Sequence, residues 1–544
     1  MKKNKFLIGS VILLLASLIT KFLGAFYKIP LTKILGTSGL GVYQMIYPIF
    51  ALFVMLASSG LVVAISKSVA VSKNHKNKIK LILKSGFFIA IVFSIFLTFV
   101  FALLSPILAA KQGDKNFVIC YLLILPCILL GGICAVFRGY FFGNNKMVTN
   151  GVAQIIEQFS KIIFAIMFAK VFFELGIVWT VGGALLGITT SEVIVTAFYF
   201  FNFKRQSKTK QLYKKVLKCI KKIVKPNQVF FCKTKKLCFW QMTKHILTTS
   251  FFVTIQASIL PLVSAIDGVI ITPQLIKNGI SNQVAYTVFG LSAGIVSSII
   301  SLPLVVASSI GSAIIPNIQN ENKQSIAKKI SFAIKIVWLA GIAFCAVILI
   351  VPNQILSFLF AGSLSTKFVD EFQICSDLLR ISCFGSLYLC LLTISTSILQ
   401  GLGKSQTPAI NLFVSAIIRF AILFVLFATK SLSIYAIAIS DIAFYGLAFA
   451  LNLFAIKKQA KIAFALKKIF VWPVLSAGLM IFAILLSKNI FSNLLSPKAL
   501  TITICSCGLL AYLVGLVLTK TIDLNEIYSY LSSEHKKRLN LNKN

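Results

Sequence analysis

Ten ionisable side chains, five acidic and five basic, are the main candidates for charges inside long apolar stretches of the sequence. A charged side chain at mid-membrane costs roughly 2.5–3.5 kcal/mol on insertion scales, so each one needs an opposite charge or a water-filled cavity. The equal numbers predict that many of these charges neutralise one another inside a helical bundle. The acids are Glu157, Glu192, Asp267, Asp377 and Asp441, and the bases are Lys21, Lys161, Lys335, Arg380 and Arg419.

Two opposite-charge pairs are close in sequence. Glu157 and Lys161 are four residues apart, and Asp377 and Arg380 are three apart, so each pair shares a helix face. Such pairs either brace helices or take part in ion coupling, and the sequence leaves both roles open. Arg380 is also a candidate contact for a substrate.

Arg419 and Asp441 have no opposite charge within a helical turn of sequence. Only a short turn around residues 430–431 separates the two apolar stretches that carry them, so an ion pair between neighbouring helices is one expectation. A site for a coupling ion is the other. Glu192 and Asp267 are further candidates for ion coupling, although Asp267 is also placed to cap a helix end.

Lys21 is the strongest candidate for binding an anion. No acid lies within a turn of it in the sequence, which predicts an aqueous cavity that attracts anions. Lys28 follows seven residues later on the same helix face. The next apolar stretch carries Tyr43, Gln44 and Tyr47, whose aromatic rings and polar groups suit a sugar.

These residues must be positioned by membrane-spanning helices. The chain is 58% hydrophobic, with a mean hydropathy of +0.93. Its apolar runs are long enough to cross a hydrocarbon core of about 30 Å as helices. We therefore expect an all-α integral membrane protein with about fourteen spans. The expected spans are 6–26, 42–66, 85–109, 117–137, 151–172, 177–202, 246–267, 284–308, 326–351, 373–398, 409–429, 432–456, 469–487 and 499–519.

The net charge of +41 reflects membrane orientation rather than nucleic-acid binding. Most basic residues stand in alternate segments between the apolar runs, as the positive-inside rule requires. This alternation predicts an even number of spans in an inner membrane, with both termini cytoplasmic. Within the long basic segment 203–244, residues 208–225 have apolar and lysine-rich faces, which predicts contact with anionic inner-leaflet lipids.

A weak internal repeat divides the chain. Arg138, Gly139 and Gly143 end one span, Gly401, Gly403 and Lys404 end another, and each following span carries a cation, Lys161 or Arg419. Repeated halves are a recurring plan of transporters. The predicted parts are an N-lobe at 1–202, the basic loop at 203–244, a C-lobe at 245–456, two added helices at 457–519 and a cytoplasmic tail at 520–544.

The sequence carries no motif of a nucleotide-driven pump or an enzyme. It has no P-loop, no HExxH motif and no CxxC pair, and its outer loops hold few acids. We expect no catalytic residue, cofactor or metal site. An integral-membrane glycosyltransferase and a scaffold that transports nothing are the alternatives to a transporter.

The order of several short motifs resembles bacterial polysaccharide-export flippases, in the superfamily that also holds multidrug and toxin extrusion transporters. Within it the chain looks most like the stage V sporulation protein B group, which is related to MurJ-type lipid II flippases. The motifs are Thr20-Lys-Phe-Leu-Gly24, Lys28-Ile-Pro30, Leu35-Gly36, Tyr43-Gln44, Tyr47-Pro48, Arg138-Gly-Tyr-Phe-Phe-Gly143, Ile266-Asp267, Leu302-Pro303, Ile315-Pro-Asn-Ile318, Leu379-Arg380-Ile381 and Gln400-Gly-Leu-Gly-Lys404.

This resemblance implies two six-helix lobes around a cavity that opens alternately to each side, plus two C-terminal helices. It implies substrates that are saccharides linked to undecaprenyl diphosphate, and it matches Lys21 to a cavity cation of the first span. The spans at 42–66 and 284–308 lack the arginines of Gram-negative lipid II flippases. A monomeric flippase is the leading expectation. A drug antiporter of the same fold, coupled to H⁺ or Na⁺ through Asp441, Glu192 and Asp267, is the alternative.

Overall fold

The computed structural model describes residues 2–72, 75–206, 233–318, 323–360, 370–429, 432–460, 470–492, 494–519 and 521. These residues are almost all helical, and no strand occurs among them. Thirteen of the helices in these ranges are long and apolar enough to span a membrane. The longest contains two predicted spans, so the expectation of about fourteen spans in an all-α membrane fold is confirmed. The predicted lipid-binding residues 208–225 lie outside the described ranges, as does the predicted tail apart from Thr521.

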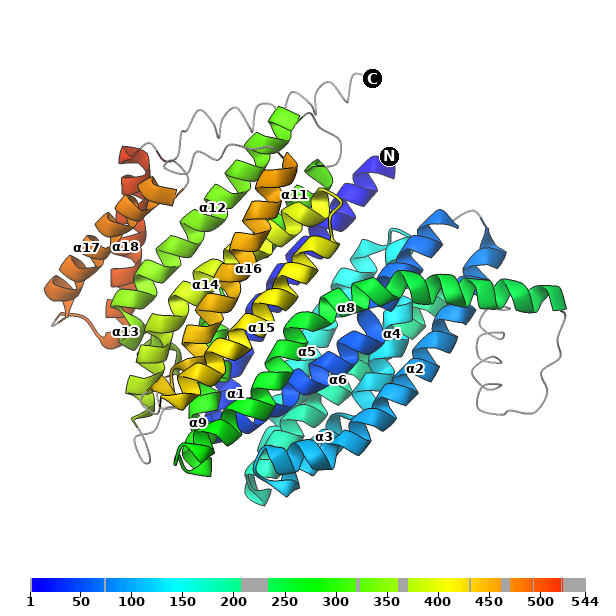
Figure 1. Ribbon diagram of the computed structural model, residues 1–544, viewed down its shortest axis with the longest axis horizontal. Helices are drawn as coiled ribbons and strands as arrows, with labels where there is room; N and C mark the ends of the chain where they lie inside the picture. The colour runs from blue at the N-terminus through cyan, green and yellow to red at the C-terminus, as the bar shows by residue number, and fades with distance from the viewer. Residues whose placement is uncertain are drawn as a thin grey trace. The chain divides into compact units, whose positions relative to one another are not determined.

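The chain divides into two compact units, Met1–Ser298 and Ile299–Asn544. This division differs from the predicted lobe boundary in the 203–244 loop, which stays a prediction. Figure 1 shows the helices of both units by label. Unit 1 contains α1 (Lys2–Val71), α2 (Lys76–Lys111), η1 (Lys115–Phe117), α3 (Val118–Ile124), α4 (Pro126–Gly143), α5 (Met147–Val171), η2 (Phe173–Leu175), α6 (Ile177–Gln206), α8 (Lys233–Lys277), α9 (Asn282–Phe289) and the π-helical segment η3 (Gly290–Val296).

Unit 2 follows the short helix α10 (Ser297–Ile300), which crosses the division. Its helices α14 and α16 pack together, and α17 and α18 run side by side as a pair (Figure 1). The helices are α11 (Leu304–Ile318), α12 (Lys323–Ile350), α13 (Pro352–Phe360), α14 (Glu371–Gly401), α15 (Gln406–Ala428), α16 (Ala436–Ala460), α17 (Trp472–Phe491) and α18 (Pro497–Leu518).

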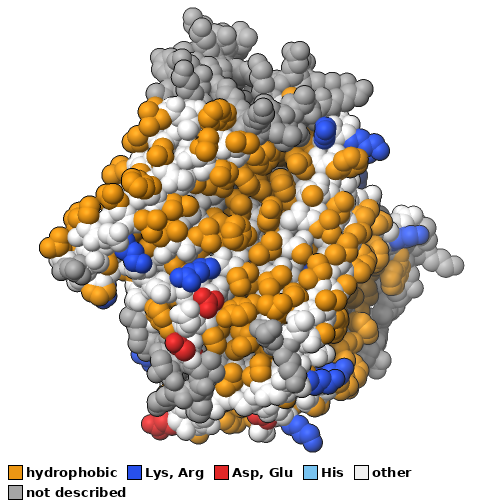
Figure 2. Space-filling view, turned by 60° about the vertical axis from the view of Figure 1, so that its left-hand side comes forward, with side chains coloured by type: hydrophobic (Ala, Val, Ile, Leu, Met, Phe, Trp, Pro, Cys, Tyr) orange, Lys and Arg blue, Asp and Glu red, His pale blue; other side chains and the backbone are white. Residues whose placement is uncertain are grey.

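Much of the surface is apolar, as a lipid-facing surface must be. On the face drawn in Figure 2, hydrophobic side chains dominate and charged ones are few. Phe251, Phe454 and Phe482 each keep at least 60% of their side-chain surface exposed. A protein surrounded by water would bury such rings, so the surface fits a multi-pass membrane protein.

Glycines decide how α1 is shaped and packed. Gly36 has φ 68° and ψ 177°, a backbone conformation that interrupts α1 between its two spans. A Cβ atom at Gly143 would stand 2.6 Å from Val69 Cβ, and one at Gly139 would stand 2.9 Å from the Val62 carbonyl oxygen. Gly139 and Gly143 therefore let α4 approach the second half of α1 closely.

The predicted repeat has a counterpart in local geometry. After α4, Asn145 has φ 58°, and Lys146 N donates to Phe141 O at 2.9 Å. After α14, Gly403 has φ 80°, and Lys404 N donates to Leu399 O at 2.9 Å. Each helix is followed by a residue with left-handed backbone angles. A hydrogen bond between residues five positions apart then completes a Schellman turn. The same type of turn thus precedes α5 and α15.

Candidate functional site

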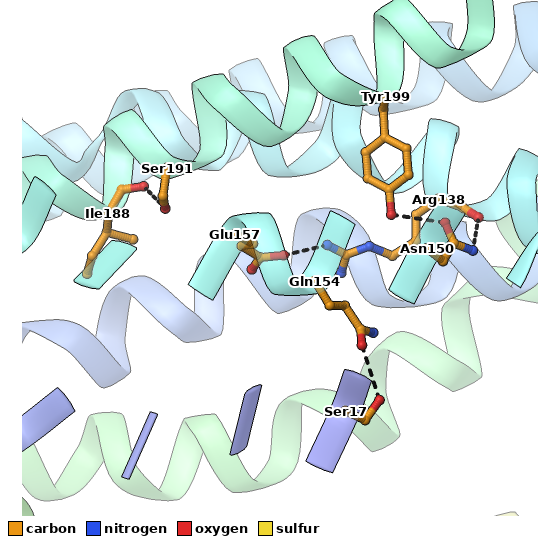
Figure 3. Close-up of polar contacts among 8 residues, drawn as sticks. All are labelled: Ser17, Arg138, Asn150, Gln154, Glu157, Ile188, Ser191 and Tyr199. Carbon is orange, nitrogen blue, oxygen red and sulfur yellow. Dashed lines mark hydrogen bonds and ion pairs between the residues drawn. The ribbon is translucent and has the colours of Figure 1, made fainter. Parts of the chain in front are cut away.

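Arg138 and Glu157 form an ion pair between α4 and α5. Arg138 Nη2 donates to Glu157 Oε2 at 3.0 Å, and both side chains are about one-third exposed. Asn150 Nδ2 donates to the Arg138 carbonyl oxygen, and Tyr199 OH donates to Asn150 Oδ1, which ties α6 to the same place (Figure 3). The helix continues through Gly143, so Arg138 belongs to the bundle and not to a loop.

This ion pair corrects one prediction. Glu157 and Lys161 share a face of α5, yet no ion pair joins them within the described residues. Glu157 instead takes the guanidinium of Arg138, which reaches across from α4. The bidentate geometry and five donors of a guanidinium favour a carboxylate partner more strongly than an ammonium does.

Glu192 lies beside this ion pair on α6. Within the described part of the chain, its Oε2 atom is buried without a hydrogen-bond partner, and so is the Arg138 Nε atom. Glu192 interacts electrostatically with Glu157, Arg138 and Lys161. Two carboxylates therefore compete for one guanidinium, and only Glu157 holds it.

Lys161 lies among tyrosine rings of α1. Its Nζ donates to Tyr47 OH at 3.3 Å and stands 4.6 Å from the centroid of that ring. The Tyr27 ring centroid is 6.0 Å away, and Tyr43 stacks on Tyr47 with centroids 5.5 Å apart. Tyr27 precedes the break at Gly36 and the other two follow it, so the kinked α1 surrounds the ammonium from two sides.

Lys28 completes what we call the lysine–tyrosine cluster, with Tyr27, Tyr43, Tyr47 and Lys161. Its Nζ donates to Gly294 O and to Ser297 Oγ, each at 3.3 Å. Gly294 belongs to η3, where π-helical geometry changes the usual backbone hydrogen bonds.

The predicted substrate contact Gln44 also forms a hydrogen bond to η3. Its Nε2 atom donates to Ala293 O at 2.6 Å, and the side chain is buried. Gln44 therefore braces α1 against η3 and is not presented at the surface of the cluster.

The two lysines of the cluster differ from the arginines in their partners. In the described part of the chain, neither Lys28 nor Lys161 lies within ion-pair distance of a carboxylate, and both donate to neutral oxygen atoms. Arg138, Arg380 and Arg419 all pair with acids. The cluster therefore offers positive charge that an anion can take up.

Unit 2 holds two further ion pairs among its described residues. Arg419 Nε lies 2.8 Å from Asp441 Oδ1, and the arginine side chain is 1% exposed beneath the ring of Phe444. This is one of the two arrangements that the sequence left open, and it joins α15 to α16. Arg380 pairs with Asp377 along α14 at 3.4 Å and is 45% exposed, so its predicted contact with substrate stays a prediction.

Other predicted residues are placed apart from these contacts. Lys21 lies on α1 with an exposed side chain, and Asp267 is half-buried on α8. Gly401 is buried at the end of α14, while Gly403 and Lys404 form the exposed turn after it. Among the residues with described placement, no three His, Cys, Asp or Glu side chains are grouped to hold a metal ion.

Sequence reasoning missed Tyr27 and undervalued Lys161. The signal lay in Tyr43 and Tyr47, four residues apart on one face, and in Tyr27 directly before Lys28. Only the backbone break at Gly36 brings these two segments to one ammonium, and Gly36 alone did not reveal the direction of that break.

Comparison with known proteins identifies the family. Residues 6–320 match the sequence profile of a family described as "Polysaccharide biosynthesis protein". The chain belongs to this family. It is 25% identical to stage V sporulation protein B of Bacillus subtilis (strain 168) over 476 residues, with 86% of each protein covered. It is 23% identical to lipid II flippase MurJ of the same organism over 444 residues, with 76% of each covered.

The fold agrees with this family. A solved structure of lipid II flippase MurJ in an inward closed conformation superimposes with a TM-score of 0.68 at 14% identity, covering 94% of this chain and 99% of the other. The resemblance noted from motifs and the predicted fold class are both confirmed.

Proposed function

We propose that this protein is a flippase that moves a saccharide linked to undecaprenyl diphosphate across the cytoplasmic membrane by alternating access. The relatives support a transporter of this kind, since one of them is named a lipid II flippase. The observation that carries the proposal is the lysine–tyrosine cluster, where, among the described residues, the two ammonium groups donate to neutral oxygen atoms alone.

The cluster suits a diphosphate for electrostatic reasons. The free-energy cost of moving an unpaired diphosphate through hydrocarbon is prohibitive, so the protein must supply cations. A hydrogen bond from an ammonium to a charged oxygen is roughly twice as strong as one to a neutral oxygen. A diphosphate oxygen therefore displaces the Tyr47 hydroxyl from Lys161, and that hydroxyl becomes available to the saccharide.

The remaining expectations belong to this proposal. Lys21 attracts the diphosphate towards the cluster along α1, and both termini lie in the cytoplasm. Residues 208–225 contact anionic inner-leaflet lipids. The protein works as a monomer, performs no catalysis and needs no cofactor.

A reconstituted flipping assay tests the proposal. Vesicles that contain the purified protein receive fluorescent lipid II, and an external quencher reports the fraction that reaches the outer leaflet. We expect Lys161→Met to slow flipping about tenfold or more, because it removes a charge-assisted contact. Lys170→Met removes an exposed lysine from the same helix and is expected to flip at the wild-type rate.

Two results would contradict the proposal. One is flipping at the wild-type rate by Lys161→Met. The other is the behaviour of a drug antiporter, with ethidium exported by the same vesicles, export lost in Asp441→Asn, and no lipid moved. Lys21→Ala in a flippase-depleted strain adds a cellular test, in which we expect correctly inserted protein that does not restore growth.

A further inference from the structure

Glu192 has no role in the proposed diphosphate contacts, yet it is a half-buried acid of unit 1. One of its carboxylate oxygens is fully buried and has no hydrogen-bond partner among the described residues. A charged carboxylate in that condition loses a large solvation free energy, whereas a neutral carboxyl group loses much less. The local geometry therefore favours the neutral acid.

The groups around Glu192 explain why it stays without a partner. From α5 it faces Glu157 and Lys161, and from α4 it faces Arg138 and the thiols of Cys127 and Cys134. Arg138 is held by Glu157 at 3.0 Å, and Lys161 is held by Tyr47 at 3.3 Å. Neither cation forms an ion pair with Glu192 within the described residues. The described interactions of Glu192 with charged groups are limited to these.

We propose that Glu192 is a proton-binding site whose occupancy sets the affinity of Lys161 for the anionic head group. The inference rests on the proposed function for the identity of the anion. A proton from water converts the Glu192 carboxylate into a neutral carboxyl. The summed charge of Arg138, Glu157, Lys161 and Glu192 then rises from zero to plus one.

The link to the anion site is short. Glu157 and Lys161 are four residues apart on one face of α5, and both interact with Glu192. A proton on Glu192 removes a negative charge close to Lys161, so an anion binds there more tightly. At the effective dielectric of a protein site, one charge at such a separation changes affinity by about tenfold or more.

Infrared difference spectroscopy tests the proton site without any substrate. Purified full-length protein in nanodiscs is shifted from acidic to alkaline pH, and the carboxyl C=O stretching band is followed. Because the chain has 13 acidic residues, the informative signal is the part of the band that Glu192→Gln removes. We expect the acidic-pH band to lose a component in Glu192→Gln and to keep that component in Glu174→Gln, which removes an exposed acid of η2. A band that Glu192→Gln leaves unchanged overturns the proposal.

A binding titration tests the coupling. Undecaprenyl diphosphate is titrated into the same nanodiscs at several pH values. Because the ligand also titrates, the informative quantity is the affinity of Glu192→Gln relative to wild type at each pH. We expect a ratio near one at acidic pH that rises about tenfold at alkaline pH, since glutamine mimics the protonated acid. A ratio that does not change with pH overturns the coupling.

The two measurements separate this inference from the proposed function. If wild-type protein binds no undecaprenyl diphosphate at any pH, the proposed substrate fails. The infrared band still decides whether Glu192 holds the proton. Circular dichroism and gel filtration of Glu192→Gln confirm that the variant is folded.

Discussion

The two units use the same turn and place a cation at the same sequence separation after it, but they treat that cation differently. In unit 2, Arg419 follows Gly403 on α15 and pairs with Asp441 of the next helix at 2.8 Å. In unit 1, Lys161 follows Asn145 on α5, and the acid of the next helix, Glu192, is not its ion-pair partner.

This difference distinguishes a structural ion pair in unit 2 from a candidate binding site in unit 1. The buried Arg419–Asp441 pair neutralises itself and joins two helices, so it has little left to offer a ligand. Lys161 instead rests on tyrosines, and Glu192 keeps a carboxylate oxygen without a partner. An arrangement that leaves a cation and an acid separately available costs stability, which is the usual condition of a binding site.

The largest expected effect comes from breaking the Arg419–Asp441 ion pair. Asp441→Asn removes the carboxylate that pairs with the buried guanidinium of Arg419, and we expect a loss of about 3–5 kcal/mol in the free energy of unfolding. Unfolding by sodium dodecyl sulfate in mixed micelles measures it. A loss below about 1 kcal/mol would show that the pair in unit 2 is not structural.

A smaller effect is expected for Glu157→Gln. The Arg138–Glu157 pair is partly exposed, and Glu192 stands ready to accept the released guanidinium, so we expect a loss of about 1–2 kcal/mol. The same micelle titration applies.

The double variant Glu157→Gln/Glu192→Gln sharpens this prediction. It removes both possible partners of Arg138, so its cost should exceed the sum of the two single costs. Strict additivity would mean that Glu192 does not replace Glu157.

The smallest effects concern the repeated turn. Gly403→Ala puts a Cβ atom on a residue with φ 80°, and we expect it to cost roughly 1–2 kcal/mol. Asn145→Gly keeps the left-handed conformation and should stay within about 0.5 kcal/mol of wild type. Equal changes in the free energy of unfolding for the two variants would contradict the expected cost of a Cβ atom on a left-handed residue.

The sequence predicted the helices well and the partners of the charges poorly. Spans follow from apolar length, which a membrane dictates directly. Partners depend on how helices rotate about one another, so the spacing of Glu157 and Lys161 suggested a pair that Arg138 replaces. Arg419 and Asp441 were easier because a short turn makes their helices neighbours. The site at Lys161 depended on the backbone angle at Gly36, which sequence patterns do not give.

Titration calorimetry of undecaprenyl diphosphate against the purified protein tests the central claim most directly. The lysine–tyrosine cluster predicts that Lys161→Met and Lys28→Met each weaken binding about tenfold or more, while Lys170→Met binds like wild type. Wild-type affinity in both cluster variants would contradict the claim that these two ammonium groups receive the diphosphate.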